Sequence, residues 1–157
     1  LFKKFNLTPL VNSPLKGSYA KRDIKRTADY LGIPFTIPEP FPVNSVSACR
    51  AYYSIVDDNP QIARKFALRI MRNYFQLNIN LSDSENILKA ASEEGLDVRV
   101  LSAKIENDTT KERLRFEVDK AIERGVFGSP IFIVENEMFW GTDRLDQLTK
   151  WIVSGSW

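Results

Sequence analysis

Residues 125–134 read Gly-Val-Phe-Gly-Ser-Pro-Ile-Phe-Ile-Val, and this stretch decides the fold class. The apolar run 131–134 is short, continuous and rich in β-branched residues, which predicts a strand buried on both faces. A proline directly before such a strand often adopts the cis form, although it can also be a loop residue that merely starts the strand. In the cis reading, the amide and carbonyl of Ser129 are free to pair with an extended ligand, as a neighbouring strand would.

The residues that follow predict a strand–turn–strand–helix unit. Glu135 and Asn136 favour a tight turn, and residues 137–140 favour a second strand that ends at Gly141. Thr142 or Asp143 is then in position to cap a final helix. The apolar positions of that helix are Leu145, Leu148 and Ile152.

Upstream of residue 125 the pattern is helical, with one interruption. The interruption is a stiff, extended connector over residues 33–43, which contains four prolines. Helices are predicted on both sides of it from apolar spacing, capping boxes and glycine stops. They cover residues 19–31, the stretch from Asn44 or Ser45 through Ile55, residues 60–77, the stretch from a capping box at Ser82 to Gly95, residues 98–105, and the stretch from a capping box at Thr109 to Gly125.

The composition excludes several kinds of chemistry. The chain has 157 residues, of which 43% are hydrophobic, enough for one domain or one domain with an insertion. A net charge of +2, with interleaved signs, predicts no nucleic-acid partner. One cysteine and no histidine exclude a Cys-x-x-Cys dithiol, a Ser-His-Asp triad and the usual zinc sites, so we expect no metal. No apolar run is long enough for a membrane span, and the scarcity of cysteine favours a cytoplasmic location.

Two stretches of the C-terminal region carry a resemblance to a known family. Gly125-Val-Phe-Gly-Ser-Pro130 and Phe139-Trp-Gly-Thr-Asp-Arg-Leu-Asp146 resemble the disulfide-oxidoreductase-like family that includes 2-hydroxychromene-2-carboxylate isomerase and kappa-class glutathione transferases. Residues 14–19, 34–35 and 41–45 match the same family in order and spacing, so the resemblance covers nearly the whole chain. It implies an α/β fold in which residues 1–18 and 126–157 form a thioredoxin-like domain. Residues 19–125 would form a large, all-helical insertion, and the chain would end in the ββα unit.

The resemblance implies glutathione as the cofactor and assigns residues to it. Lys16, on a proline-rich loop, would grip the carboxylate at the glycine end, although a lysine there can also be merely solvated. The start of the last helix would hold the γ-glutamyl end, with Asp143 pairing with its ammonium group, a role that can coexist with simple N-capping. The implied glutathione-binding residues are Asn6, Lys16, Ser129, Pro130, Thr142, Asp143 and Arg144.

Two further residues have alternative interpretations. Trp140 is expected to serve partly in hairpin packing and partly as a wall of the substrate pocket. Cys49, within a predicted helix, is interpreted as a small buried residue rather than a nucleophile.

The chain departs from the family at its beginning. The family's catalytic serine lies in the first βα turn, near a Ser-Pro-x-Ser-Tyr type of motif, and no residue here matches it; Ser13 and Pro14 belong to the Lys16 loop. The first strand of a thioredoxin-like sheet is missing with that serine, which would leave the strand at 131–134 with an unpaired edge. We expect either that residues precede Leu1 or that another segment fills the gap. No catalytic residue is assigned within the chain.

The resemblance implies a glutathione-dependent isomerase of 2-hydroxychromene-2-carboxylate or a related intermediate of aromatic catabolism. A kappa-like glutathione transferase would share the site but release a conjugate, and a non-catalytic thioredoxin-like binding module is the third reading. A dithiol oxidoreductase is disfavoured by the single cysteine, although a Cys-x-x-Cys in residues that precede Leu1 would revive it. The partner would be a small aromatic substrate, and a homodimer stays open because dimers are common among relatives.

Overall fold

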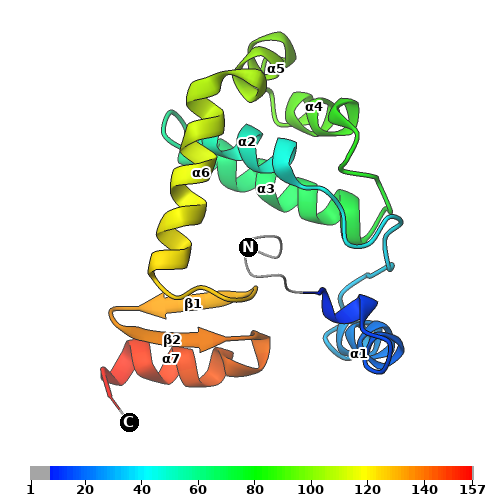
Figure 1. Cartoon of the computed structure of the whole chain (residues 1–157), viewed down its shortest axis with the longest axis vertical. Helices are drawn as coiled ribbons and strands as arrows, with labels where there is room; N and C mark the ends of the chain where they lie inside the picture. Colours follow the sequence, from blue (N-terminus) through cyan, green and yellow to red (C-terminus); the bar gives the residue numbers. More distant parts are fainter. Residues whose placement is uncertain (1–7, 157) are drawn as a thin grey trace. The chain divides into compact units, whose positions relative to one another are not determined.

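The structure is a computed structural model, and it describes residues 8–156 (Figure 1). These residues divide into two compact units, residues 8–117 and residues 118–156, with the boundary inside the long helix α6. In chain order the elements are the 3₁₀ turn η1 (Leu10–Asn12), α1 (Gly17–Tyr30), α2 (Val46–Ile55), α3 (Pro60–Phe75), α4 (Ser84–Glu93), α5 (Val98–Glu106), α6 (Asp108–Glu123), β1 (Ile131–Val134), β2 (Glu137–Trp140), the 3₁₀ turn η2 (Thr142–Arg144) and α7 (Leu145–Ser154).

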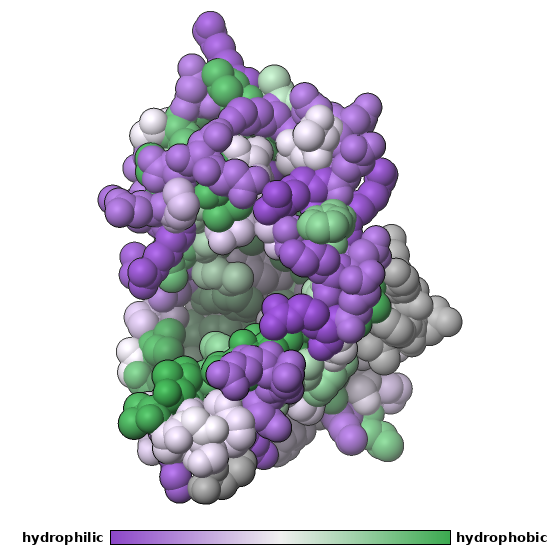
Figure 2. All heavy atoms as spheres, turned by 90° about the vertical axis from the view of Figure 1, so that its left-hand side faces the viewer, coloured by the Kyte–Doolittle hydropathy of each residue, from purple (hydrophilic) through white to green (hydrophobic). Residues whose placement is uncertain are grey.

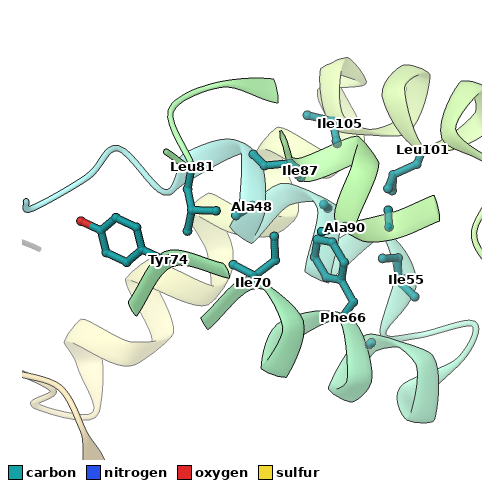
Figure 3. Close-up of a cluster of buried hydrophobic side chains, with 13 residues drawn as sticks. Ala48, Ile55, Phe66, Ile70, Tyr74, Leu81, Ile87, Ala90, Leu101 and Ile105 are labelled. Atoms are coloured by element: carbon teal, nitrogen blue, oxygen red, sulfur yellow. The ribbon is translucent and has the colours of Figure 1, made fainter. Parts of the chain in front are cut away.

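The unit of residues 8–117, called here the helical unit, is built on one apolar core. Figure 2 shows mainly hydrophilic residues on the visible surface of its helices, and the buried apolar side chains come from α2 to α5 and from Leu81. Phe66 and Ile87 are the largest side chains that are almost fully buried. Figure 3 shows the core, which comprises Ala48, Ala51, Ile55, Ala63, Phe66, Ile70, Tyr74, Leu81, Ile87, Ala90, Ala91, Leu101 and Ile105.

Local signals account for where the helices of this unit begin. Asn59 caps α3 by accepting from the Ile62 N–H (3.0 Å), with Pro60 in the first turn. Asp97 caps α5 by accepting from two N–H groups. The two predicted capping boxes are wrong in detail. Asp83, not Ser82, caps α4, and α6 begins at Asp108 behind Asn107, whose side chain accepts from the Thr109 N–H.

The proline-rich connector lies against the end of α3. Its Glu39–Pro40 and Phe41–Pro42 peptide bonds are cis. The Thr36 N–H donates to the Phe75 carbonyl oxygen (2.7 Å), and the Tyr74 hydroxyl donates to the Pro40 carbonyl oxygen (2.7 Å). The connector is therefore tied to the core through backbone groups and aromatic contacts, with no strand needed.

The unit of residues 118–156, called here the C-terminal unit, contains the predicted hairpin and closing helix. β1 and β2 pair antiparallel, with Ile131 opposite Trp140. Phe139 and Leu148 are its buried apolar side chains, and Phe139 lies against Trp151 of α7 (ring centroids 6.4 Å apart). Figure 2 also shows apolar residues at the surface of this unit. The ββα order is as predicted, and the described chain is α/β, mostly helical with a two-stranded sheet.

One expectation about the sheet is wrong. The sequence predicts that the run 131–134 is buried on both faces, but all four residues of β1 are only half-buried. Among the described residues β1 pairs with β2 alone, so its other edge has no strand partner within residues 8–156. The assignment of residues 1–18 and 126–157 to one domain, with 19–125 inserted, stays a prediction.

Candidate functional site

The segment before β1 presents unpaired backbone groups. The Ser129–Pro130 peptide bond is cis, in agreement with the interpretation of the proline. The Gly141 N–H donates to the Pro130 carbonyl oxygen (3.0 Å), which extends the pairing of the two strands by one residue. Within the described part of the chain, neither the amide nor the carbonyl of Ser129 has a hydrogen-bond partner. Ser129 therefore offers one donor and one acceptor to a ligand.

Two aromatic rings lie beside this segment. Phe127 and Trp140 meet edge to face, with centroids 5.2 Å apart and planes at 71°. Both remain about half exposed, at 54% and 57% of their surface. Gly128 lies between them in sequence and against the indole in space, since a Cβ built on it would be 2.7 Å from the indole Nε1. Rings placed so could pack against a flat apolar substrate.

The segment after β2 carries an ion pair at the surface. Arg144 Nη1 lies 2.9 Å from Asp143 Oδ2, and the two side chains are 47% and 72% exposed. Gly141, with φ of 99°, lets the chain turn from β2 into η2, and a Cβ there would collide with the Asp143 carboxylate. Adjacent acidic and basic side chains suit a zwitterionic ligand that carries an ammonium and a carboxylate.

The predicted cap of the last helix is wrong. Neither Thr142 nor Asp143 forms a side-chain capping hydrogen bond. The residue before η2 is Gly141, and Arg144 occupies the position before α7. Thr142 is instead the first residue of η2, and Asp143 turns its carboxylate to Arg144. Asp143 is thus not committed to the backbone.

Lys16 lies in the helical unit, directly before α1. Its backbone N–H lies 3.4 Å from the Ser13 hydroxyl, and its exposed side chain has no ion-pair partner within residues 8–156. Gly17, the first residue of α1, is buried, and a Cβ there would be 2.5 Å from the Val11 carbonyl oxygen. The close approach of α1 to η1 therefore holds the turn that carries Lys16.

The predicted glutathione residues are distributed over both units. Ser129, Pro130, Thr142, Asp143 and Arg144 lie in the C-terminal unit, where the Gly141–Pro130 hydrogen bond connects the two segments that carry them. Lys16 belongs to the helical unit. Asn6 lies outside the described residues.

Cys49 behaves as a structural residue. It is half-buried in α2, and burial raises the pKa of its thiol, an effect that a hydrogen bond with Ser45 partly offsets. A raised pKa keeps the thiol protonated, which is the opposite of what a nucleophilic cysteine needs.

A shallow cavity of about 270 Å³ lies elsewhere in the helical unit, along α3. Arg69 lies in it and is neutralised by Glu93 (2.8 Å) and by Glu94. None of the predicted site residues lines this cavity. Residues 8–156 contain no group of three or more acidic or sulfur side chains placed to hold a metal ion. No helix in the described chain has the length and apolar character needed to cross a membrane.

Two glycines contribute to the site, and sequence reasoning does not single them out. In the sequence, Gly17 is only a residue next to Lys16 on a proline-rich loop, and Gly128 is only part of the family pattern. Their signal in the sequence is weak because neither glycine is required by its own backbone conformation. Gly17 is required by the close approach of Val11, and Gly128 by that of Trp140.

Comparisons with known proteins agree with this architecture. The family model described as DSBA-like thioredoxin domain matches residues 2–153. A 2-hydroxychromene-2-carboxylate isomerase of Sphingobium xenophagum is 28% identical over 131 residues, which cover 83% of this chain and 65% of that protein. Human glutathione S-transferase kappa 1 is 26% identical over 156 residues, covering 88% of this chain and 69% of the relative. The chain thus spans just under two thirds of the Sphingobium relative.

A solved structure is similar over almost the whole chain. A selenomethionine structure of 2-hydroxychromene-2-carboxylate isomerase superimposes with a TM-score of 0.83 at 25% identity. The match covers 97% of this chain and 73% of that one.

Proposed function

The chain belongs to the family of DsbA-like thioredoxin domains, and on this basis we propose that it acts as a glutathione-dependent isomerase. Its substrate would be 2-hydroxychromene-2-carboxylate or a related intermediate of aromatic catabolism, processed in the cytoplasm. Relatives that carry the isomerase name, in sequence and in structure, support this choice of reaction.

The observation that carries the proposal is the backbone of Ser129, whose amide and carbonyl have no hydrogen-bond partner within residues 8–156. Glutathione is an extended tripeptide, and its own amide groups can pair with a free N–H and C=O as an added strand does. Ser129 offers these two groups next to Pro130, directly before β1.

The charged residues carry charges opposite to those at the two ends of glutathione. The γ-glutamyl end carries an ammonium and a carboxylate, and Asp143 and Arg144 offer one charge of each sign at one place. Lys16 has an ammonium without an ion-pair partner in residues 8–156, which suits the glycine carboxylate. Bound glutathione would supply a thiol nucleophile. The tasks of these residues are to bind and orient it, while the half-exposed rings of Phe127 and Trp140 pack against the aromatic substrate.

A kappa-like glutathione transferase is the second candidate, because a kappa-class relative matches over 88% of the chain. The test offers the full-length protein the chromene carboxylate and, separately, an electrophilic aromatic, each with glutathione. Isomerisation without consumption of glutathione supports the isomerase. Formation of a conjugate supports the transferase. Glutathione binding without turnover of either supports a non-catalytic module, and no binding overturns the proposal.

Substitution of the charged residues tests the site directly. Lys16→Ala and Asp143→Ala are each expected to weaken glutathione binding about tenfold, because each removes one charge-assisted contact. Isothermal titration calorimetry measures the affinity. Lys150→Ala, in the same unit as Asp143 but on α7, serves as the control. Unchanged affinity in both site variants would remove the site assignment. A homodimer is a further proposal, and light scattering of the purified protein checks it.

A further inference from the structure

Trp140 combines exposure with a close backbone contact. It is more than half exposed, yet the backbone of Gly128 lies beside the Nε1 side of its indole ring. A Cβ at residue 128 would be 2.7 Å from Nε1, 3.3 Å from Cε2 and 3.4 Å from Cδ1. Gly128 has no positive φ, so space, rather than backbone conformation, is what requires a glycine here.

The neighbours of Ser129 are both anchored to the end of β2. Before it, Gly128 lies beside the Nε1 side of the Trp140 ring, and Phe127 meets the same ring edge to face, with centroids 5.2 Å apart. After it, the Pro130 carbonyl oxygen accepts from the Gly141 N–H at 3.0 Å. Two consecutive residues of the hairpin therefore hold the residues on either side of Ser129, while the backbone groups of Ser129 have no partner within residues 8–156.

We propose that Trp140 is a positioning residue that, through Gly128, fixes the backbone of Ser129 in the orientation needed to pair with an extended peptide ligand. This rests on the proposed function, since the ligand is glutathione. Trp140 acts through another residue and need not touch the ligand. Fixed donors and acceptors bind more tightly than mobile ones because less ordering is left to the binding step.

The first test needs no ligand. The Gly141 amide reports on whether residues 128–130 stay on the hairpin, because it donates to Pro130. Hydrogen exchange followed by NMR in the full-length protein should show its protection falling about tenfold in Gly128→Ala and in Trp140→Ala. The Val134–Glu137 end of the hairpin should keep its protection. Unchanged protection of Gly141 in both variants would overturn the positioning role, whatever the ligand is.

The second test is a double-mutant cycle on glutathione affinity. Gly128→Ala and Trp140→Ala are each expected to weaken binding about tenfold, and the double variant should be no weaker than Trp140→Ala alone. The reason is that the methyl group added at position 128 has no ring to strike once the indole is gone. If Trp140→Ala weakens glutathione binding and Gly128→Ala does not, Trp140 touches the ligand. If the losses of affinity in the two single variants add up in the double variant, the two residues have independent roles. Either result overturns the proposal.

Controls separate this inference from the proposed function. Glu137→Ala, at the other end of β2 and exposed, should bind like the wild type. Trp140→Phe keeps a ring without Nε1 and should recover most of the glutathione affinity that Trp140→Ala loses. If Trp140 served only the stability of the fold, variants with the same melting temperature would bind glutathione equally well. If the wild type fails to bind glutathione, the proposed function fails, and the exchange experiment alone then decides the role of Trp140.

Discussion

The two units of the chain differ in how much they bury. The helical unit encloses a core of 13 buried apolar side chains, contributed by α2 to α5 and by the loop that carries Leu81. In the described part of the C-terminal unit, Phe139 and Leu148 are the buried apolar side chains, while Trp140, Ile152 and Val153 stay mostly exposed. Since apolar burial is the main stabilising term in folding, most of the stability of the described chain resides in the helical unit.

The C-terminal unit, by contrast, carries most of the groups that suit a ligand. Its unpaired backbone at Ser129, its half-exposed rings and its surface ion pair leave polar and apolar groups accessible. Polar groups without a partner are costly in a buried core. At the surface they are tolerated, and they can bind a ligand when packing against rigid structure fixes their position. The helical unit contributes Lys16, which is held by a close packing contact of Gly17.

The largest effect is expected in the core of the helical unit. Phe66, 1% exposed, is replaced by alanine. The free energy of unfolding should fall by about 3–5 kcal/mol, because the change removes buried surface and leaves a cavity. Urea unfolding measures it, and Leu68→Ala on the same helix, 49% exposed, is the control with a change of less than about 1 kcal/mol. Equal losses would contradict the placement of the core.

A second substitution asks whether the small unit opens by itself. Phe139→Ala removes the larger of its two buried apolar side chains. Amides of β1, β2 and α7 should exchange faster, while those of α2 to α5 keep their protection, since few buried contacts of the C-terminal unit remain. Hydrogen exchange with mass spectrometry resolves the two sets. Faster exchange of amides in both units would show that they unfold together as one cooperative unit, which would contradict the difference in stability between them.

A smaller effect is expected at the turn that carries Lys16. Gly17→Ala places a Cβ 2.5 Å from the Val11 carbonyl oxygen, and backbone must shift to make room. A loss of about 1–3 kcal/mol in the free energy of unfolding follows, as for other overpacked sites. Ser18→Ala, exposed one residue later in the same helix, is the matched control. An unaffected Gly17→Ala variant would mean that α1 does not depend on this contact.

The smallest effect is a pH dependence at Cys49. Burial raises the pKa of its thiol above the ordinary value of 9.0. A raised pKa in the folded state means that its contribution to stability is complete below that value and is lost as the pH rises through the folded-state pKa. The wild type should therefore lose slightly more stability than Cys49→Ala between neutral and strongly alkaline pH. Thermal melts over this range compare the two, and parallel curves would refute the shift.

Much of the fold was predictable from the sequence because its signals are local. Apolar spacing located α1 to α6 to within a few residues, and the run at 131–134 with its turn located the hairpin. The capping residues were harder to predict. The side chains of Asp83 and Asn107, rather than those of Ser82 and Thr109, accept hydrogen bonds from N–H groups at the starts of α4 and α6. A capping pattern identifies a helix start only approximately, because neighbouring Ser, Thr, Asp and Asn residues compete for the same N–H groups.

In the C-terminal unit, local patterns predicted the ββα order, and they left a cis bond before β1 as one of two interpretations of Pro130. The contacts of Gly128 with Trp140 and of Gly17 with Val11 were decided only by the tertiary structure, as was the half-burial of β1. The reason is physical. Secondary structure follows from the spacing of neighbouring residues, whereas close approach and burial depend on which distant segment arrives, and no local pattern specifies that segment.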